Sequence, residues 1–600
     1  MEKTKAELLF EISWEVCNKV GGINTVLRSK AEQIAKYYED NYYVIGPYFA
    51  NKVAGEFEEE LPEDNFKPVY DALKNKGIIL HFGRWLIKGN PKAILIDFNS
   101  FMNQCNEIKK ELWQSFKIDS LNASHDYDEP VVWAYASGIV LENLNKIFKK
   151  KMAAQFHEWL AGAGLLYLKE KKVKIGTIFT THATVLGRTL ASANFDLYGS
   201  SGNNKLKLET IDVEKAAYEC HVESKHQVER EAAKNAEVFT TVSEITGIEA
   251  THILKRKPDV LLPNGLDMEK FPTFEDSSVK HKFYRNIIKE FILCYFFPYY
   301  VFDIRDTLIF FLAGRYEFRD KGIDIYIKAL QKLNDRLKAE KSKKTIVAFI
   351  WVPANIRGIN QEFLENKIMF RDIKESINEN MHHFQNSILY SVLSRKILNQ
   401  ENLFSKDFLE EIKIKIAKIT KKGTPSLSTH DLVDQNDEII RNLIPISLDN
   451  QEDDNVKVVF YPTYLNGADG LLDLTYYEAM SGCHLGVFPS FYEPWGYTPL
   501  EAAALGVSSV TTDLAGFGRF IVKKNQKKQP GIFVLKRLNR TDDEIINDLG
   551  NFMYKFSQFS RQERVLNKIE AKRLSGLADW KKLISNYIDA HNLAIEKVYK

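Results

Sequence analysis

The sequence predicts an α/β protein with two doubly wound domains that face each other across a cleft. The chain has 600 residues, which is more than one ordinary hydrophobic core accommodates. Its first fifty residues alternate strand, helix and strand patterns, and a second series of the same kind begins near Thr307. We therefore place the first domain at residues 1–270 and the second at residues 271–582.

The first half is typical of repeated β-α-β units. The apolar segment ELLFEIS is followed by a glycine turn, by helical spacing over residues 23–38 and by the strand pattern NYYVIGPYF. Parallel neighbours need a crossover helix, so this order predicts a parallel sheet. Further strands are expected at AILIDF, TIFTTHA, EVFTTVS and DVLLPNGL, with a helix at VVWAYASGIVLENLNKIF.

The second half repeats the pattern. TLIFFLAGR predicts a strand that runs into a glycine turn, and GIDIYIKALQKLNDRLKAE predicts the helix after it. TIVAFIWVPA, VKVVFYPTYL, CHLGVFPS and SSVTTDLAGFG continue the series. Residues 361–422 are polar and helical, which indicates an inserted helical hairpin. A last helix, 583–600, is expected to pack back on the first domain.

Composition excludes several classes of protein. Apolar residues make up 44% and charged residues 27%, and 82 Lys plus Arg against 80 Asp plus Glu leave a net charge of +2. That balance favours neither nucleic acid nor an anionic membrane as a partner. Five scattered cysteines without a C-x-x-C pair argue against disulfides and thiolate metal sites and favour a reducing, cytoplasmic location. The apolar stretch 291–302 contains Pro298 and is too short to span a bilayer.

Two carboxylates flank an aromatic turn in the segment PSFYEPWGYTPLE, residues 489–501. Glu493 precedes the turn, and Glu501 lies about one helical turn into the segment that follows. A helix that begins near Thr498 aims its free N–H groups at the turn, which suits a diphosphate held beside an acid. The alternative is a capped surface helix with scattered acids.

Cations and glycines stand at other expected strand ends. Lys19, Gly21 and Gly22 form the first β-α turn, where glycine lets the backbone approach a phosphate, although paired glycines are common in turns. Arg315 and Lys321 flank the turn AGRYEFRDKG and suit a diphosphate leaving group. The alternative for this pair is a solvated contact with nearby acids.

Two histidines stand near strand ends of the first half. His157 lies in FHEW and His182 in THAT, and Arg188 follows six positions after His182. A core histidine satisfied by hydrogen bonds is the alternative to a role in a site. No H-E-x-x-H spacing occurs, so the sequence does not predict a metal site.

These motifs together resemble the glycogen synthases of the animal and fungal type, glycosyltransferase family 3. The resemblance runs from about Leu8 to about Lys582. It rests on WEVCNKVGGI, HFGRWLI, FHEWLAG, FTTHATVLGR, EVFTTVSEITGIEA, THILKRKPDVLLPNGLD, FFLAGRYEF, GCHLGVFPSFYEPWGYTPLE and GFGRF. It implies two Rossmann-like domains across a cleft (the GT-B fold) and retaining transfer of glucose from UDP-glucose to the non-reducing 4-hydroxyl of an α-1,4-glucan.

The resemblance also implies roles for matching residues. Glu493 resembles the acid nearest the reacting sugar, Glu501 the acid that binds the donor ribose, and Tyr476 the ring that stacks on uracil. Arg315, Lys321 and the amides of Gly496, Tyr497 and Thr498 are expected to contact the diphosphate. His182, Arg188 and Asn264 are expected to line the glucose side, with Lys19, Gly21 and Gly22 as the opposing wall.

A covalent retaining mechanism needs a nucleophile about 5 Å from its acid partner, and the sequence shows no such pair. The family is thought to use front-side transfer, in which the leaving diphosphate takes the acceptor proton. UDP-glucose is then a substrate, and no cofactor or metal is expected.

The resemblance to the family is weaker in the segment that the family uses for regulation. The family binds glucose 6-phosphate through an arginine-rich helix, and here that stretch is SRQERVLNKIEAKRLS, with Lys568 in place of an arginine. Arg564 and Lys568, with His281 and Arg285 from a neighbouring helix, are expected to bind a sugar phosphate; the alternative is an ordinary amphipathic helix. The chain lacks the serine-rich ends of animal members, so phosphorylation control is expected to be absent or altered.

The resemblance further implies a homotetramer built through residues 361–422 and a glycogenin-like primer. Two other functions stay open at this point. One is a catalytically silent glycogen-binding homologue, and the other is a starch-type synthase that uses ADP-glucose.

Overall fold

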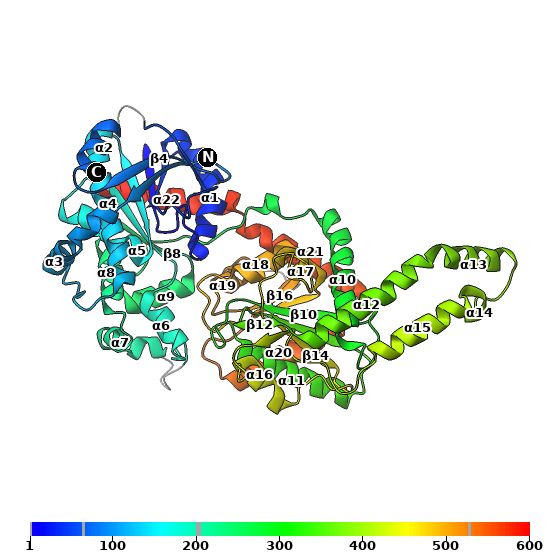
Figure 1. The fold of residues 1–600 in the computed structure, drawn as a ribbon. Coiled ribbons are helices and arrows are strands. Elements are labelled where there is room, and N and C mark those ends of the chain that lie inside the picture. Colours follow the sequence, from blue (N-terminus) through cyan, green and yellow to red (C-terminus); the bar gives the residue numbers. More distant parts are fainter. Residues whose placement is uncertain (1–2, 63–65, 200–205, 526–529, 600) are drawn as a thin grey trace.

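The computed structural model describes residues 3–62, 66–199, 206–525 and 530–599 and contains two α/β domains, each built on a largely parallel sheet (Figure 1). The predicted fold class is confirmed. Helices cover both faces of each sheet, which explains why most strands are buried along their whole length.

The first domain holds a nine-stranded sheet in the order β3-β4-β5-β2-β1-β6-β7-β8-β9. Its strands are β1 Leu8–Ile12, β2 Tyr42–Pro47, β3 Phe57–Glu59, β4 Ile79–Trp85, β5 Lys92–Asp97, β6 Met152–His157, β7 Gly176–Thr181, β8 Val238–Thr241 and β9 Val260–Leu261. Its helices are α1 Gly22–Tyr38, α2 Lys67–Lys74, α3 Cys105–Phe116, α4 His125–Phe148, α5 Glu158–Glu170, α6 Val185–Ser192, α7 Val213–Glu219, α8 Glu223–Asn235 and α9 Glu244–Ile253.

One edge of this sheet differs from the predicted parallel arrangement. Strand β4 pairs antiparallel with both β3 and β5, and β5 pairs in parallel with β2. A short turn joins β4 to β5 and contains Gly89 at φ +94°. Antiparallel strands need no crossover helix, so a tight turn suffices here.

The second domain holds a six-stranded parallel sheet in the order β14-β11-β10-β15-β16-β17. Its strands are β10 Leu308–Ala313, β11 Ile346–Trp351, β14 Val456–Tyr461, β15 Leu485–Val487, β16 Ser508–Thr512 and β17 Ile532–Leu535, with a separate ribbon of β12 Ile356–Ile359 and β13 His430–Leu432. Its main helices are α10 Phe274–Phe296, α11 Ile323–Ala339, α16 Glu438–Leu443, α17 Tyr476–Gly482, α18 Tyr497–Ala504, α19 Gly516–Lys524, α20 Asp542–Ser557 and α21 Arg561–Ser575.

The strand order of the parallel part of each sheet reverses once. The reversal lies between β1 and β6 in the first domain and between β10 and β15 in the second. Open α/β sheets bind ligands beyond the carboxyl ends of the strands at such switch points. The turns after these four strands are therefore where a site is expected.

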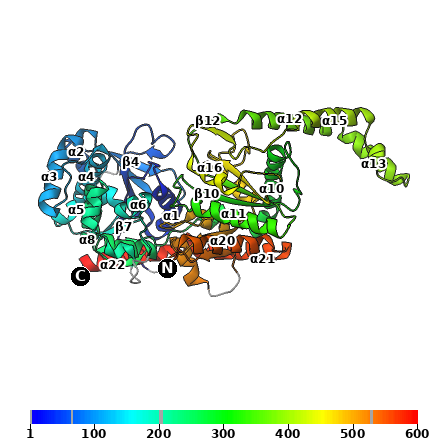
Figure 2. The same ribbon diagram turned by 90° about the horizontal axis from the view of Figure 1, so that it is seen from below.

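A helical arm projects from the second domain (Figures 1 and 2). It consists of α12 Gln361–Glu379, α13 Met381–Leu393, α14 Gln400–Leu403 and α15 Lys406–Ile419. Helices α12 and α15 lie side by side, and α13 and α14 form the far end. The arm thus has four helices, where the sequence suggested a simple hairpin.

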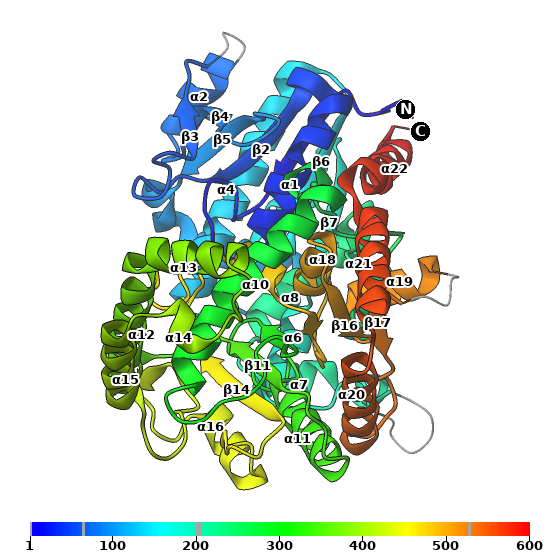
Figure 3. The same cartoon turned by 90° about the vertical axis from the view of Figure 1, so that its right-hand side faces the viewer.

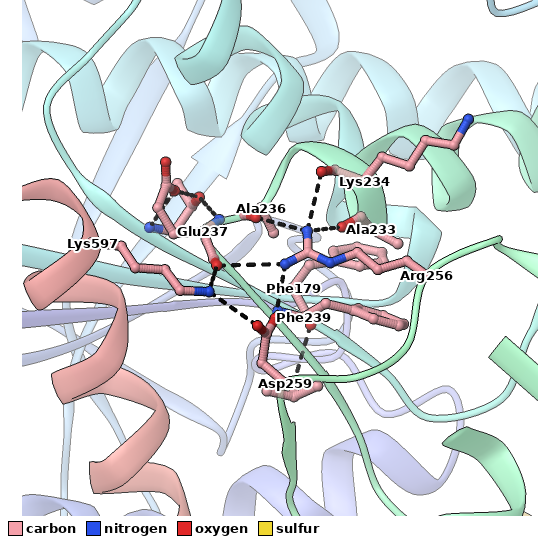
Figure 4. A network of polar contacts seen from close by, with 11 residues as sticks. Phe179, Ala233, Lys234, Ala236, Glu237, Phe239, Arg256, Asp259 and Lys597 are labelled. Carbon is pink, nitrogen blue, oxygen red and sulfur yellow. Dashed lines mark hydrogen bonds and ion pairs between the residues drawn. The ribbon is translucent and has the colours of Figure 1, made fainter. Parts of the chain in front are cut away.

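The last helix, α22 (Trp580–Val598), leaves the second domain and packs on the first (Figure 3). Lys597 donates to the Glu237 carbonyl and to Asp259, while Arg256 donates to the same Asp259 (Figure 4). The chain therefore connects the domains twice.

Within the described parts of the chain, no helix is both long and apolar enough to cross a membrane. The apolar stretch 291–302 supplies the end of α10, where Phe291, Tyr295 and Phe296 are buried in a core cluster of the second domain.

Candidate active site

Two turns meet at the switch point of the second sheet. One follows β10 and ends at Gly322, and the other follows β15 and contains Glu493. Phe491 N–H donates to the Asp320 carbonyl at 2.9 Å, which ties the turns together. Gly322 has φ +70°, and a Cβ there would lie 2.1 Å from the Pro489 carbonyl oxygen. Only glycine fits this close approach.

The junction pairs Lys321 with Glu493. Lys321 Nζ donates to Glu493 Oε2 at 2.7 Å, and the two side chains are 16% and 22% exposed. Both line a small recess together with Thr498. Arg315, in contrast, is 67% exposed and pairs with Glu317 at 2.8 Å. The structure thus brings Lys321 to the acid and leaves Arg315 at the rim of the turn.

The recess also receives the start of α18. The helix begins at Tyr497, and its N-cap, Gly496, lies at φ +104° and provides no side-chain cap. The first N–H groups of a helix have no partner within it and favour an anion. Trp495, which precedes Gly496 in the turn, is buried and packs on Phe517 and Phe520.

Glu501 lies in a different environment from Glu493. Its Oε1 accepts a hydrogen bond from Tyr477 at 2.8 Å, and burial raises the pKa of the Glu501 carboxyl. The ring of Tyr476 lies 5.5 Å from that of Tyr477. The sequence prediction named Tyr476 and missed Tyr477, since two adjacent tyrosines give no signal of which one contacts the acid.

His157 and His182 meet in the first domain, at the ends of β6 and β7. His157 Nδ1 lies 2.9 Å from His182 Nε2, and both residues are buried. Arg188 lies on α6, and its charge lowers the pKa of His182 after the larger effect of burial. The Oδ1 atom of Asn264 is buried and accepts no hydrogen bond from the described residues.

Glu158 was missed by the sequence analysis. It has φ +63°, unusual for a residue other than glycine, and its carboxylate accepts the backbone N–H groups of His182 and Ala183 at 3.1 and 3.2 Å. Burial raises its pKa to about 7, against the opposing effect of Arg188. Glu158 thereby fixes the backbone at His182.

The glycine turn of the first domain does not present a free phosphate cradle. The Glu15 carboxylate accepts the N–H groups of Gly21 and Asn24, both at 2.8 Å, and so occupies the start of α1. The Gly21 N–H thus already has a partner in this structure, and its contact with a phosphate stays a prediction. Lys19 and Gly22 remain exposed beside the turn.

The loop that carries Glu493 also contacts the first domain. Tyr492 O–H donates to Glu249 at 3.0 Å, and Glu249 also accepts from the Thr184 hydroxyl at 2.6 Å. Ser192 donates to Asp320 at 3.3 Å in a second contact between domains. The loop that carries Glu493 is thus hydrogen-bonded directly to the first domain.

Four further predicted residues gather on the far side of α18. Lys568 Nζ lies 2.8 Å from His281 Nδ1, and Arg285 donates to the carbonyls of Gly482 and Cys483 at 3.0 and 3.3 Å. Arg564 donates to the Phe559 carbonyl. Within the described residues, no carboxylate forms a salt bridge with Arg285, Arg564 or Lys568. Burial, and then the two arginines, lower the pKa of Lys568 to about 7.

Among the described residues, no group of three or more His, Cys, Asp or Glu side chains is arranged to hold a metal ion. The candidate site consists of the Lys321–Glu493 pair, the start of α18, the linked histidines His157 and His182, and Arg188.

The chain is similar to known proteins over most of its length. A family model described as glycogen synthase matches residues 11–600. The liver glycogen [starch] synthase of Mus musculus is 37% identical over 99% of this chain and 84% of its own length. Isoform 2 of the Saccharomyces cerevisiae enzyme is 38% identical over 99% of this chain and 86% of its own length. The catalytic domain of starch synthase IV from Arabidopsis thaliana superposes with a TM-score of 0.52 at 12% identity, over 99% of this chain and 100% of that one. That likeness supports the GT-B fold.

Proposed function

The chain belongs to the glycogen synthase family, and from that premise we propose that it transfers glucose from UDP-glucose to the non-reducing 4-hydroxyl of an α-1,4-glucan, with retention. The observation that carries this proposal is the Lys321–Glu493 pair, which lies at the switch point beside the start of α18. A catalytically silent homologue need not keep such a pair.

In this proposal the protein mainly stabilises charge. Lys321, Arg315 and the first N–H groups of α18 hold the diphosphate as the glycosidic bond breaks and negative charge grows on it. Glu493 lies beside Lys321, near the sugar, where a carboxylate stabilises positive charge at the anomeric carbon. The departing diphosphate takes the proton of the acceptor hydroxyl. In this front-side mechanism Glu493 and Glu501 are not a nucleophile and acid pair, and in the structure they have different partners.

The remaining predicted residues have supporting roles. Tyr476 and Glu501 would bind uracil and ribose, and His182, Arg188 and Asn264 would line the glucose side. Lys19 would approach the diphosphate from the first domain with its side chain, beside the exposed Gly22. No cofactor or metal is required by these steps.

The choice of glucosyl donor is tested by competition. Equal concentrations of UDP-glucose and ADP-glucose, each with a different isotope, are offered with an α-1,4-glucan acceptor. We expect incorporation from UDP-glucose to dominate. Preferential incorporation from ADP-glucose would support a starch-type synthase, and no incorporation from either would support the silent homologue.

We further propose that His281, Arg285, Arg564 and Lys568 bind glucose 6-phosphate as an activator. Three basic side chains without a carboxylate partner favour a phosphate group. His281 stays neutral because burial lowers its pKa to about 3.

This activator site has an expected pH dependence. Lys568 loses its proton near pH 7 in the free protein, and a bound dianion would raise its pKa again. Binding should therefore take up a proton, and affinity should fall as pH rises from about 7 to 8.5, by up to about tenfold per unit. Titration calorimetry measures this, with Lys568→Arg as the control whose charge stays fixed. Parallel pH profiles for the two proteins would contradict the assignment.

We propose a homotetramer with contacts through the helical arm. Exposed apolar residues gather on α13 and just after it, at Ile388, Leu389, Val392, Leu393 and Ile397. Light scattering should give the mass of four chains, and Leu389→Glu with Leu393→Glu should lower it. Lys328→Glu on α11 is the control. A monomeric wild-type protein would refute the proposal.

A glycogenin-like primer and a cytoplasmic location remain predictions. The first rests on the family, and the second on the scattered cysteines of the sequence.

A further inference from the structure

A chain of buried hydrogen bonds runs from His182 into the core of the first domain. His182 Nε2 lies 2.9 Å from His157 Nδ1, and His157 Nε2 lies 2.7 Å from Glu11 Oε1. Glu11 also pairs with Lys30 and accepts the Tyr42 hydroxyl at 2.5 Å. Glu11, Lys30 and His157 are at most 1% exposed. An ion pair with two histidines aligned on it is an expensive arrangement for a core.

The chemistry of these groups fixes the direction of every hydrogen bond. An ammonium group has no acceptor, so Lys30 can only donate to Glu11. Lys30 and His157 hold the pKa of the Glu11 carboxyl well below its usual range despite its burial. The ionised carboxylate can only accept hydrogen bonds, so His157 Nε2 must carry a proton and donate a hydrogen bond to it.

His157 is then neutral or doubly protonated. A second proton would place another positive charge in the core beside Lys30, with one carboxylate to balance both. Burial lowers the pKa of His157 by more than the hydrogen bond and charge of Glu11 raise it, and the charge of Lys30 lowers it further. His157 is therefore neutral, and its Nδ1 accepts a hydrogen bond from the N–H group at His182 Nε2. Burial also lowers the pKa of His182, so its other nitrogen, Nδ1, carries a lone pair.

Nδ1 of His182 accepts no hydrogen bond from the described residues, and it is not among their enclosed side-chain atoms without a partner. His182 is 7% exposed and follows β7 at the carboxyl edge of the sheet. This edge faces the second domain, because Tyr492 reaches Glu249 from there. The lone pair is thus left for a ligand that lies between the two domains.

We propose that Glu11 and His157 are positioning residues that set His182 as a hydrogen-bond acceptor for one hydroxyl group of the transferring sugar. The proposal deepens the proposed function and rests on it for the identity of the sugar. The order of protons along Glu11, His157 and His182 does not depend on that identity. The C-terminal helix completes the arrangement, since the Tyr587 ring lies 4.4 Å from Lys30 Nζ and His591 lies near the same charges.

The proton order is read directly from the ¹⁵N resonances of the histidine rings in the full-length wild-type protein. The signals missing from His182→Asn assign His182. We expect Nε2 to be protonated and Nδ1 unprotonated. A protonated Nδ1 in the wild-type protein overturns the proposal whatever the enzyme activity.

The second test changes the order of protons along Glu11, His157 and His182, which we call the relay. In Glu11→Gln with Lys30→Met the charges leave together, and the new amide N–H₂ can donate to His157 Nε2. The amide oxygen can also accept there, so the single proton order should be lost, and a population of His182 with a protonated Nδ1 should appear. Tyr42→Phe is the matched control: it removes one hydrogen bond from the same carboxylate and should leave the order unchanged. An unchanged order in the double variant contradicts the relay.

The role toward the sugar is tested with UDP-glucose analogues that carry fluorine in place of one hydroxyl, because fluorine cannot donate. For one analogue, the loss of kcat/KM relative to UDP-glucose should be about 10- to 100-fold larger with the wild-type protein than with the double variant. Tyr42→Phe should behave like the wild-type protein. Equal losses in all three proteins refute the role. A protein inactive with UDP-glucose whose Nδ1 is unprotonated would refute the proposed glucosyl donor and support the relay.

Discussion

Replacing Glu493 by glutamine is expected to lower kcat for glucose transfer by about 10²–10³-fold, which corresponds to about 3 kcal/mol or more of lost transition-state stabilisation. The amide oxygen can still accept the hydrogen bond from Lys321, so the fold and the turn should persist. What disappears is a negative charge held in a partly buried recess. Steady-state kinetics measure the loss of catalysis, and calorimetry of UDP binding shows whether the site itself is intact.

Glu501→Gln is the natural comparison for this variant. Glu501 is tied to Tyr477 and would contact the ribose, so its loss should mainly raise KM for the nucleotide sugar. Near-normal kcat in Glu493→Gln would remove Glu493 from the mechanism. A loss of UDP binding in that variant would instead indicate a structural role.

Gly322→Ala is expected to destabilise the second domain and to inactivate the site together. Its φ of +70° costs an alanine about 1–2 kcal/mol, and the new Cβ would collide with the Pro489 carbonyl at 2.1 Å. We expect the free energy of unfolding to fall by about 2–4 kcal/mol in total. Because Pro489 begins the segment that carries Glu493, kcat should fall as well.

Gly55→Ala separates the cost of a positive φ from the cost of the collision with a neighbouring carbonyl. Gly55 has a similar φ of +75°, but nothing lies within 4 Å of the position that its Cβ would occupy. It should show the backbone cost alone, about 1 kcal/mol, with normal activity. The midpoint of urea unfolding compares the variants, and equal shifts for Gly55→Ala and Gly322→Ala would contradict the close packing of the two turns.

The sequence allowed the central pair to be predicted for a physical reason. Strands of a doubly wound sheet expose their carboxyl ends at one edge, so Lys321 and Glu493, which follow two different strands, had to lie near that edge. The pattern of apolar residues located those strands. The antiparallel edge at β3–β5 was missed, since short apolar runs carry no sign of strand direction.

Partners that form across the fold could not be predicted. Glu15 occupies the glycine turn, Glu249 receives Tyr492 and Glu11 receives His157, over separations of 6 to 243 residues. No local period encodes such pairs, because they depend on how the packed elements meet. The Glu15 contact also shows why a glycine turn in the sequence is not by itself a free phosphate site, because the Gly21 N–H already has a partner.

The most direct test of the central claim is the product of a single transfer reaction. UDP-[¹⁴C]glucose is incubated with the wild-type protein and a short α-1,4-linked maltooligosaccharide, and the elongated product is digested from its non-reducing end by an enzyme specific for α-1,4 bonds. The proposal predicts a labelled product that releases its glucose completely, and almost none with Glu493→Gln. A wild-type protein that yields only free labelled glucose, or a β-linked product, would contradict it.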